Sequence, residues 1–201
     1  RRLADYKRKH SEEHYYALRS RWNKPTSWRS KVARAAAFIY LNKTCYNGLW
    51  RVNSKGLFNV PMGRYSNPQI FDSAHLRAAS LVLQRAKLVH GDYQEAVKDA
   101  GRGDFLYFDP PYHPLTDTAK FTSYTANSFN EENQRELADL VHRLARRKCH
   151  VVVSNSDTPL IHKLYKGLKI FRIHATRNIN SKASARGAIT EVLVTNLRSA
   201  K

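Results

Sequence analysis

Apolar and basic positions alternate at helical spacing along much of the first 86 residues. From Leu3 to Trp22, apolar and aromatic side chains recur one helical turn apart with lysines and arginines on the other face, which predicts one basic amphipathic helix. Pro25–Ser27 interrupts this pattern, and Trp28–Leu41 predicts a second helix whose alanines allow close packing. Asp72–Ala86 predicts a third helix, capped by Asp72 or Ser73.

A β-hairpin is predicted between the second and third of these helices. Two short apolar runs, Leu49–Val52 and Leu57–Val60, flank the polar segment Asn53–Gly56. Gly56 suits a left-handed position that closes the turn, and Pro61 ends the second strand. We therefore expect residues 1–86 to form one region of helices and a hairpin.

Residues 87–201 alternate short strand patterns with helical ones, which is typical of an α/β fold. Continuous apolar runs such as Phe105–Phe108 and Val151–Val153 predict strands that are buried on both faces, in a largely parallel sheet covered by helices. The expected strands are Lys87–His90, Asp104–Phe108, His150–Ser154, Lys169–His174 and Ile189–Asn196, and the expected helices are Glu131–Arg147 and Thr158–Tyr165.

The charge of the chain favours a polyanionic partner, first of all nucleic acid. Lysine and arginine number 35 against 16 acidic residues, which gives a net charge of +19. An anionic membrane surface would suit the same charge, but no segment approaches the roughly 20 apolar residues of a spanning helix, and we expect no membrane partner. Two distant cysteines and nine scattered histidines indicate a reducing compartment and no bound metal.

The strongest chemical motif directly follows the predicted strand Asp104–Phe108 and consists of Asp109, Pro110, Pro111 and Tyr112. In an open α/β sheet, ligands bind at the carboxyl ends of the strands, so this tetrapeptide lies where catalysis is expected. The alternative is that it forms only a rigid turn between a strand and a loop.

The residue types of this tetrapeptide suit methylation of an exocyclic amino group. The nitrogen lone pair of such a group is delocalised into the ring, and two acceptors that bind both N–H bonds localise it and direct it at an electrophile. Asp109 and the Pro110 carbonyl can supply these acceptors, and Tyr112 offers a flat surface on which a flipped base can stack. The chain contains no Pro-Cys pair, which argues against covalent methylation of cytosine C5.

With these motifs the chain resembles the DNA adenine methylase (Dam-like) family of class I methyltransferases. The segments that match the family in order are Asn42–Arg51, Gly56–Pro61, Gly63–Tyr65, Asp109–Tyr112, Phe121–Tyr124, Asn127–Phe129 and Val153–Thr158. The resemblance implies a partial Rossmann-like methyltransferase sheet in residues 87–201 with an inserted helical and β-hairpin DNA-recognition region in residues 1–86. It also implies methyl transfer to N6 of an adenine flipped out of double-stranded DNA.

The resemblance places the DNA contacts in the hairpin region. Tyr46 and Asn47 would enter the duplex beside the flipped adenine, and Arg51 would recognise a guanine, since arginine is the natural bidentate partner of guanine O6 and N7. Two alternatives are that Tyr46 is a core residue and that Arg51 binds a phosphate. The implied DNA-binding residues are Tyr46, Asn47, Arg51, Asn59, Pro61 and Arg64.

The cofactor that the resemblance implies is S-adenosyl-L-methionine. Asp92 would accept a hydrogen bond from the amino group of its adenine and Tyr93 would pack on the ring, and Asp109 is the third implied cofactor-binding residue. The alternative is that Asp92 caps a helix and Tyr93 belongs to the core. The Gly-Gly-Lys and Phe-x-Gly-x-Gly segments, with which the family binds the methionine part, do not occur here.

Three further expectations follow from this resemblance. Without the family's first two strands the catalytic core is incomplete and Phe105–Phe108 has a bare edge, so we expect the chain to be truncated or half of a split enzyme. The alternatives to adenine methylation are a cytosine-N4 enzyme and an inactive DNA-binding fragment. The resemblance also implies a cytoplasmic, nucleoid-associated enzyme of a prokaryote or phage, in a restriction-modification or stand-alone role.

Overall fold

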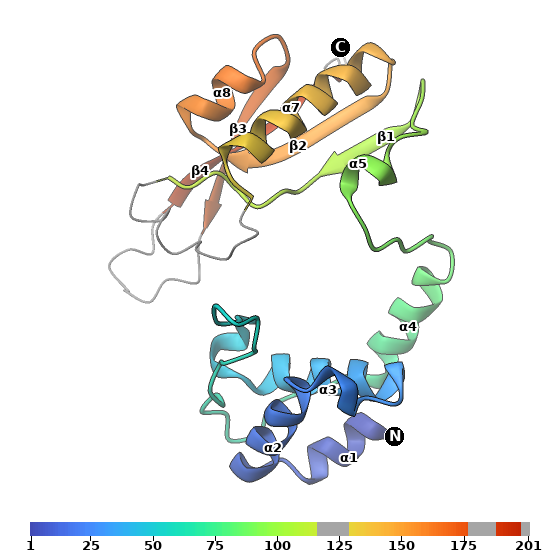
Figure 1. Ribbon diagram of the computed structural model, residues 1–201, viewed down its shortest axis with the longest axis vertical. Helices are drawn as coiled ribbons and strands as arrows, with labels where there is room; N and C mark the ends of the chain where they lie inside the picture. The colour runs from blue at the N-terminus through green and yellow to red at the C-terminus, as the bar shows by residue number, and fades with distance from the viewer. Residues whose placement is uncertain (116–128, 177–187, 198–201) are drawn as a thin grey trace. The chain divides into compact units, whose positions relative to one another are not determined.

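The computed structural model describes residues 1–115, 129–176 and 188–197. It divides into two compact units, Arg1–Leu88 and Val89–Lys201. The first unit contains helices and a hairpin, and the second contains a four-stranded sheet with helices (Figure 1). The chain is thus a mixed α/β protein.

Four α-helices form most of the first unit. They are α1 (Arg2–Arg8), α2 (Glu12–Trp22), α3 (Lys31–Thr44) and α4 (Ser73–Leu83), with short 3-10 turns at Pro25–Ser27 and Tyr46–Gly48. The prediction of one continuous helix over Leu3–Trp22 is wrong. Ser11 has an extended backbone and its side chain accepts a hydrogen bond from the His14 N–H, so a new helix starts after it. Asp72 caps α4 through the N–H groups of Ala74 and His75, as predicted.

Buried aromatic side chains form the core of the first unit. Tyr15 on α2 and Tyr40 on α3 are both 0% exposed, and burial raises the pKa of Tyr40 to about 12. The Tyr15 hydroxyl donates a hydrogen bond of 3.0 Å to the Val60 carbonyl, which ties the end of the hairpin to α2. Phe58 is also buried and stacks on Trp50, with their ring centroids 4.1 Å apart.

The hairpin is less regular than its sequence pattern predicts. Only Val52 and Phe58 form a β-bridge, so the expected strands are not continuous ladders. The turn agrees with the prediction, since Gly56 has a φ of +72° and donates its N–H to the Asn53 carbonyl. The side chain of Asn53 accepts two further N–H groups inside the turn and so fixes its shape.

The second unit is built on a mixed sheet with the strand order β1-β2-β4-β3. Its strands are β1 (Phe105–Phe108), β2 (His150–Ser156), β3 (Lys169–Thr176) and β4 (Ala188–Thr195). β1 and β2 are parallel, whereas β4 is antiparallel to both of its neighbours, so the prediction of a largely parallel sheet is wrong. The expected strand Lys87–His90 does not form, because no described strand pairs with it.

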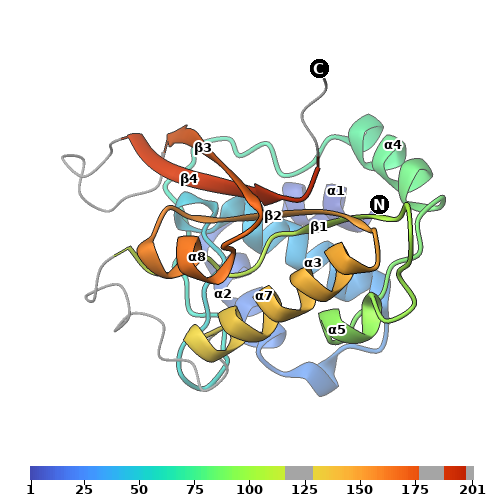
Figure 2. The same cartoon turned by 90° about the horizontal axis from the view of Figure 1, so that it is seen from above.

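Helices cover one face of this sheet. α7 (Glu131–Arg146) and α8 (Pro159–Leu164) lie on that face in both views, and α5 (Tyr93–Ala96) packs against the same core (Figures 1 and 2). Val151 and Val153 point into this core, whereas Phe105 and Tyr107 on β1 are 63% and 56% exposed. The prediction that β1 is buried on both faces is therefore wrong, since alternate residues of a strand point to opposite faces and the described helices cover only one.

We expect the core of the first unit to tolerate truncation poorly. Leu41→Ala, at a residue that is 0% exposed on α3, should lower the free energy of unfolding by about 2–5 kcal/mol. The control Val32→Ala lies on the same helix at a residue that is 72% exposed, and it should change stability by less than about 0.5 kcal/mol. Chemical denaturation measures both, and equal losses for the two variants would contradict this description of the core.

Candidate functional site

The tetrapeptide Asp109–Tyr112 lies at the carboxyl end of β1, as its position in the sequence predicts. Because β1 and β2 are parallel and Phe108 pairs with Val153, the next residue of each strand reaches the same edge of the sheet. There the Ser154 hydroxyl donates a hydrogen bond of 2.8 Å to Oδ1 of Asp109. Asp109 itself is exposed, so its carboxylate combines one fixed oxygen with access to a ligand.

Two buried amide side chains support the tetrapeptide from the core side. Gln134 on α7 donates from Nε2 to the Pro111 carbonyl at 2.9 Å, and Asn155 on β2 donates from Nδ2 to Oε1 of Gln134 at 3.0 Å. Oδ1 of Asn155 in turn accepts the His113 N–H at 2.9 Å. Sequence reasoning missed Gln134, although it is a polar residue on the same helical face as the buried Leu137, a signal that could have identified it.

Tyr112 is half-buried beside these groups. Burial raises the pKa of its hydroxyl above the ordinary value, partly offset by hydrogen bonding to Ser154. The side chain is thus neutral at physiological pH, and it combines an aromatic surface with a polar end at the edge of the sheet.

A pocket of about 370 Å³ adjoins Asp109 and Pro110. Tyr93 and Phe129 contribute aromatic walls to it, with their ring centroids 6.4 Å apart. The Tyr93 hydroxyl is buried without a hydrogen-bond partner, which leaves one donor for a ligand. Asp92 caps α5 by accepting the Gln94 N–H, as the alternative interpretation of the sequence predicts. This hydrogen bond occupies one oxygen of its carboxylate.

The hairpin of the first unit exposes the residues that the sequence singles out there. Tyr46 is 53% exposed, which excludes the alternative that it belongs to the core. Asn47 next to it has a φ of +54°, a conformation that asparagine tolerates better than most residues. Arg51 donates from Nε to Oδ1 of Asn59 at 3.3 Å, and Arg64 is exposed. The Pro61 carbonyl accepts the Tyr46 N–H and joins the two ends of this segment.

Asn23, which sequence reasoning also missed, fixes the hairpin to the end of α2. Its side chain donates to the Phe58 carbonyl at 3.0 Å and accepts the Phe58 N–H at 2.8 Å. Both backbone groups of one buried residue are thus satisfied by a single amide. No pattern in the sequence indicates this contact, because the two residues are 35 positions apart.

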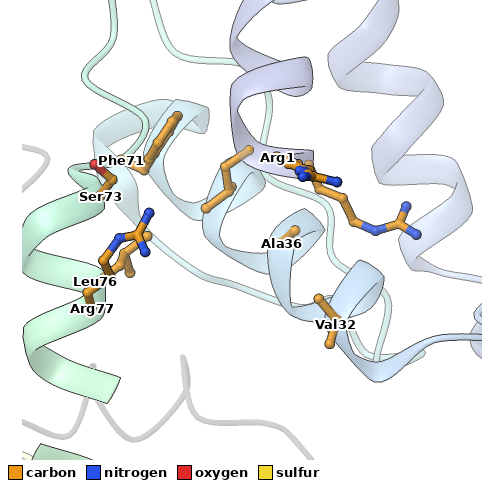
Figure 3. Close-up of a pocket in the computed structure, with 9 residues that line it drawn as sticks. Arg1, Val32, Ala36, Phe71, Ser73, Leu76 and Arg77 are labelled. Carbon is orange, nitrogen blue, oxygen red and sulfur yellow. The ribbon is translucent and has the colours of Figure 1, made fainter. Parts of the chain in front are cut away.

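A second pocket lies within the first unit, between α1, α3 and the start of α4 (Figure 3). Its volume is about 440 Å³, and it combines apolar walls with three arginines. None of its described lining residues is a carboxylate, a histidine or a cysteine, so it offers no acid, base or metal ligand. The residues that line it are Arg1, Arg2, Leu3, Val32, Ala36, Phe71, Ser73, Leu76 and Arg77.

Within residues 1–115, 129–176 and 188–197, no group of three or more histidine, cysteine, aspartate or glutamate side chains is arranged to hold a metal ion. None of the helices in these ranges combines the length and apolar composition that a membrane crossing requires. Two of the segments that match the family in the sequence, Phe121–Tyr124 and the first two residues of Asn127–Phe129, lie outside the described residues.

The comparisons with known proteins agree on one family. The family model described as D12 class N6 adenine-specific DNA methyltransferase matches residues 2–179. The chain is 45% identical to the type II methyltransferase M1.LlaDCHI of Lactococcus lactis subsp. cremoris, over 96% of this chain and 69% of the relative. It is 44% identical to the type II methyltransferase M.MjaIII of Methanocaldococcus jannaschii, over 96% and 67%. Identity to the DNA adenine methylase of Escherichia coli K12 is 38%, over 90% and 64%.

The contacts of Asn23 predict how the hairpin responds to substitution. Asn23→Ala leaves the N–H and carbonyl groups of buried Phe58 without their partners and should destabilise the hairpin by about 1–3 kcal/mol. Hydrogen exchange at the Phe58 amide should become correspondingly faster. The exposed Asn67 provides the matched control, and Asn67→Ala should leave this exchange unchanged. Equal exchange at Phe58 in all three proteins would show that the contact does not stabilise the hairpin.

Proposed function

The chain belongs to the D12 class N6 adenine-specific DNA methyltransferases, and on this premise we propose that Asp109–Tyr112 binds and activates the target adenine. The observation that carries this proposal is the hydrogen bond from Ser154 to Asp109 at the open edge of the sheet. It orients an exposed carboxylate beside a pocket large enough for a small molecule. The methyl donor that we propose is S-adenosylmethionine.

The chemistry requires two acceptors for the amino group of adenine. Oδ1 of Asp109 already accepts from Ser154, so we assign the other carboxylate oxygen to one N–H bond of N6. The Pro110 carbonyl is the second acceptor. Together they draw the N6 lone pair out of conjugation with the ring and direct it at the methyl group. After transfer N6 carries one proton too many, and the free oxygen of Asp109 is placed to accept it and release it to solvent.

An adenine can reach these groups only outside the base stack. Enzymes that modify a base within a duplex extrude it and stack it on aromatic side chains, and Tyr112 next to the two prolines is suited to that role. Its neutral hydroxyl places no charge beside the ring. The flipped base would then present N6 toward Asp109.

The pocket beside Asp109 fits the flat part of the proposed cofactor. Tyr93 and Phe129 offer aromatic surfaces, and the unpartnered Tyr93 hydroxyl offers a hydrogen bond. One oxygen of Asp92 is used in capping α5, and the other can accept from an amino group of the cofactor. When it is bound, S-adenosylmethionine would supply an electrophilic methyl group, whose bond to sulfur would break as the neutral thioether leaves. The role of the residues of this chain is to exclude water from it and to align N6.

The hairpin is the part that we propose to contact the duplex. Tyr46 and Asn47 protrude on a short turn, which suits insertion beside a displaced base. The contact between Arg51 and Asn59 restricts the guanidinium before it meets a guanine edge. Pro61 fixes the base of the hairpin, and Arg64 adds positive charge for the phosphates. The net charge of +19 would attract DNA to the protein in the nucleoid.

Substitution of Asp109 tests the proposed chemistry. Asp109→Asn replaces one acceptor by a donor and should lower the rate of methyl transfer by at least ~10²-fold, while DNA binding changes little. We would measure incorporation of labelled methyl groups into a duplex and identify N6-methyladenine in the product. The control Asp139→Asn lies on the outer side of α7 and should behave as the wild type. Saturable DNA binding with no methylation by the wild-type chain would contradict the proposed activity and indicate a DNA-binding fragment.

Arg51 and Lys55 should affect DNA binding in different ways. Arg51→Ala should cost about 1–3 kcal/mol on the preferred sequence and relax selectivity at one base pair, since it removes a contact to a base. Lys55→Ala, in the turn of the same hairpin, should weaken binding to every sequence and reduce the salt dependence by about one counterion. Fluorescence anisotropy with duplexes that vary one base pair at a time distinguishes the two. An equal loss of affinity for every duplex in Arg51→Ala would show that Arg51 binds a phosphate.

A further inference from the structure

The most deeply buried polar groups next to the tetrapeptide are Gln134 and Asn155, the amide pair. They are 1% and 0% exposed, and they lie on different elements, the helix α7 and the strand β2. Each donates one hydrogen bond and accepts at least one, in a continuous series from the Pro111 carbonyl to the His113 N–H. Asn155 also accepts the Ser156 N–H at 2.9 Å, which fixes its own orientation.

The prolines determine how the hydrogen bonds of the amide pair affect the backbone of the tetrapeptide. A residue that precedes proline is restricted to extended conformations, which applies to Asp109, Pro110 and His113. In extended or polyproline backbone, successive carbonyls point in different directions. When Gln134 draws the Pro111 carbonyl toward the core, the Pro110 carbonyl cannot point the same way. The amide pair thus selects the orientation of a carbonyl that it does not contact.

We propose that Gln134 and Asn155 are positioning residues for methyl transfer, which direct the Pro110 carbonyl toward the target amino group by binding the backbone on either side of Tyr112. This inference rests on the proposed function of the tetrapeptide. Ser154 orients one acceptor, Asp109, and the amide pair orients the other. The two acceptors of N6 are therefore set by three side chains that do not touch the substrate.

Amide side chains are suited to this role in a buried place. Each carries both a donor and an acceptor, so two of them can bind a carbonyl and an N–H and still bond to each other. They carry no charge, so burial costs less than it would for a carboxylate, and their hydrogen bonds do not change with pH. A glutamate in place of Gln134 has nearly the same shape but loses the donor to Pro111 whenever it is ionised.

The test uses this difference between glutamine and glutamate. In Gln134→Glu, an ionised carboxylate repels the Pro111 carbonyl, whereas a protonated one can donate to it again. Burial raises the pKa of a carboxyl group, so lowering the pH from 8 to 6 should restore the contact. We expect kcat for methyl transfer to fall about 10- to 100-fold relative to wild type at pH 8, with KM for DNA changed less than about threefold. The ratio of variant to wild-type kcat should rise at least about fivefold at pH 6.

Asn196 provides the matched control for the second member of the pair. It also bonds to backbone near β2, through the Val151 N–H and the Cys149 carbonyl, but at the end away from the tetrapeptide. Asn155→Asp should lower kcat in the same way as Gln134→Glu, because it removes the donor to Gln134. Asn196→Asp should lower the melting temperature without a selective effect on kcat. Equal kcat losses for Asn155→Asp and Asn196→Asp would overturn the proposal.

Hydrogen exchange of the peptide that spans residues 109–115 gives a readout that does not need activity. It should be faster in Gln134→Glu than in wild type at pH 8 and approach wild type at pH 6, after correction for intrinsic rates. Unchanged exchange, or faster exchange with unchanged kcat, would overturn the positioning role. If the wild-type chain does not methylate DNA, the proposed function fails, while exchange still decides whether the amide pair holds the tetrapeptide.

Discussion

The parallel pairing of β1 with β2 is the contact on which the rest of the proposed active site depends. Its register places Phe108 beside Val153, and the chain continues from both strands at the same edge. Asp109 therefore meets Ser154, and the backbone after it meets Asn155. A shift of one residue would turn the buried Val153 and Asn155 to the opposite face of the sheet and separate these partners.

This register also explains why polar residues are buried in an otherwise apolar core. The hydrophobic cluster around Val141 and Val153 packs α7 against β2, and Gln134 and Asn155 extend the same contact toward the open edge. An apolar pair of similar size could pack there, but it would leave the Pro111 carbonyl and the His113 N–H without partners. Burial of two amides is thus coupled to the conformation of the backbone that carries the proposed chemistry.

In the first unit, too, buried side chains fix the backbone of a segment that carries exposed residues. Its exposed tyrosine and arginine side chains stand on a hairpin segment with two isolated β-bridges, Cys45 with Met62 and Val52 with Phe58, and no continuous ladder, so it has little stability of its own. The hairpin is fixed instead by Asn23, by the hydroxyl of Tyr15 and by the stacking of Phe58 on Trp50. A packed core thus supports the residues for which we propose DNA contacts, and these residues would otherwise be costly to order on binding.

The sequence by itself determined the local features and led to the proposed chemistry. Asp109–Tyr112 after an apolar strand, the cap at Asp72 and the turn at Gly56 are set by neighbouring residues, and all three occur in the structure. The break at Ser11 was missed because the helical periodicity continues across it. The family, too, could be inferred from the order of its motifs, and the comparisons confirm it.

Only the tertiary structure decided the direction of the strands, the burial of β1 and the partners of the tetrapeptide. Strand direction depends on which strands pair, and the apolar runs of β1 and β4 are the same whether their neighbours are parallel or antiparallel. The bonds of Gln134 to Pro111 and of Asn23 to Phe58 join residues 23 and 35 positions apart. Such contacts are fixed by packing of whole elements, because no local pattern of side chains carries information about a partner so far along the chain.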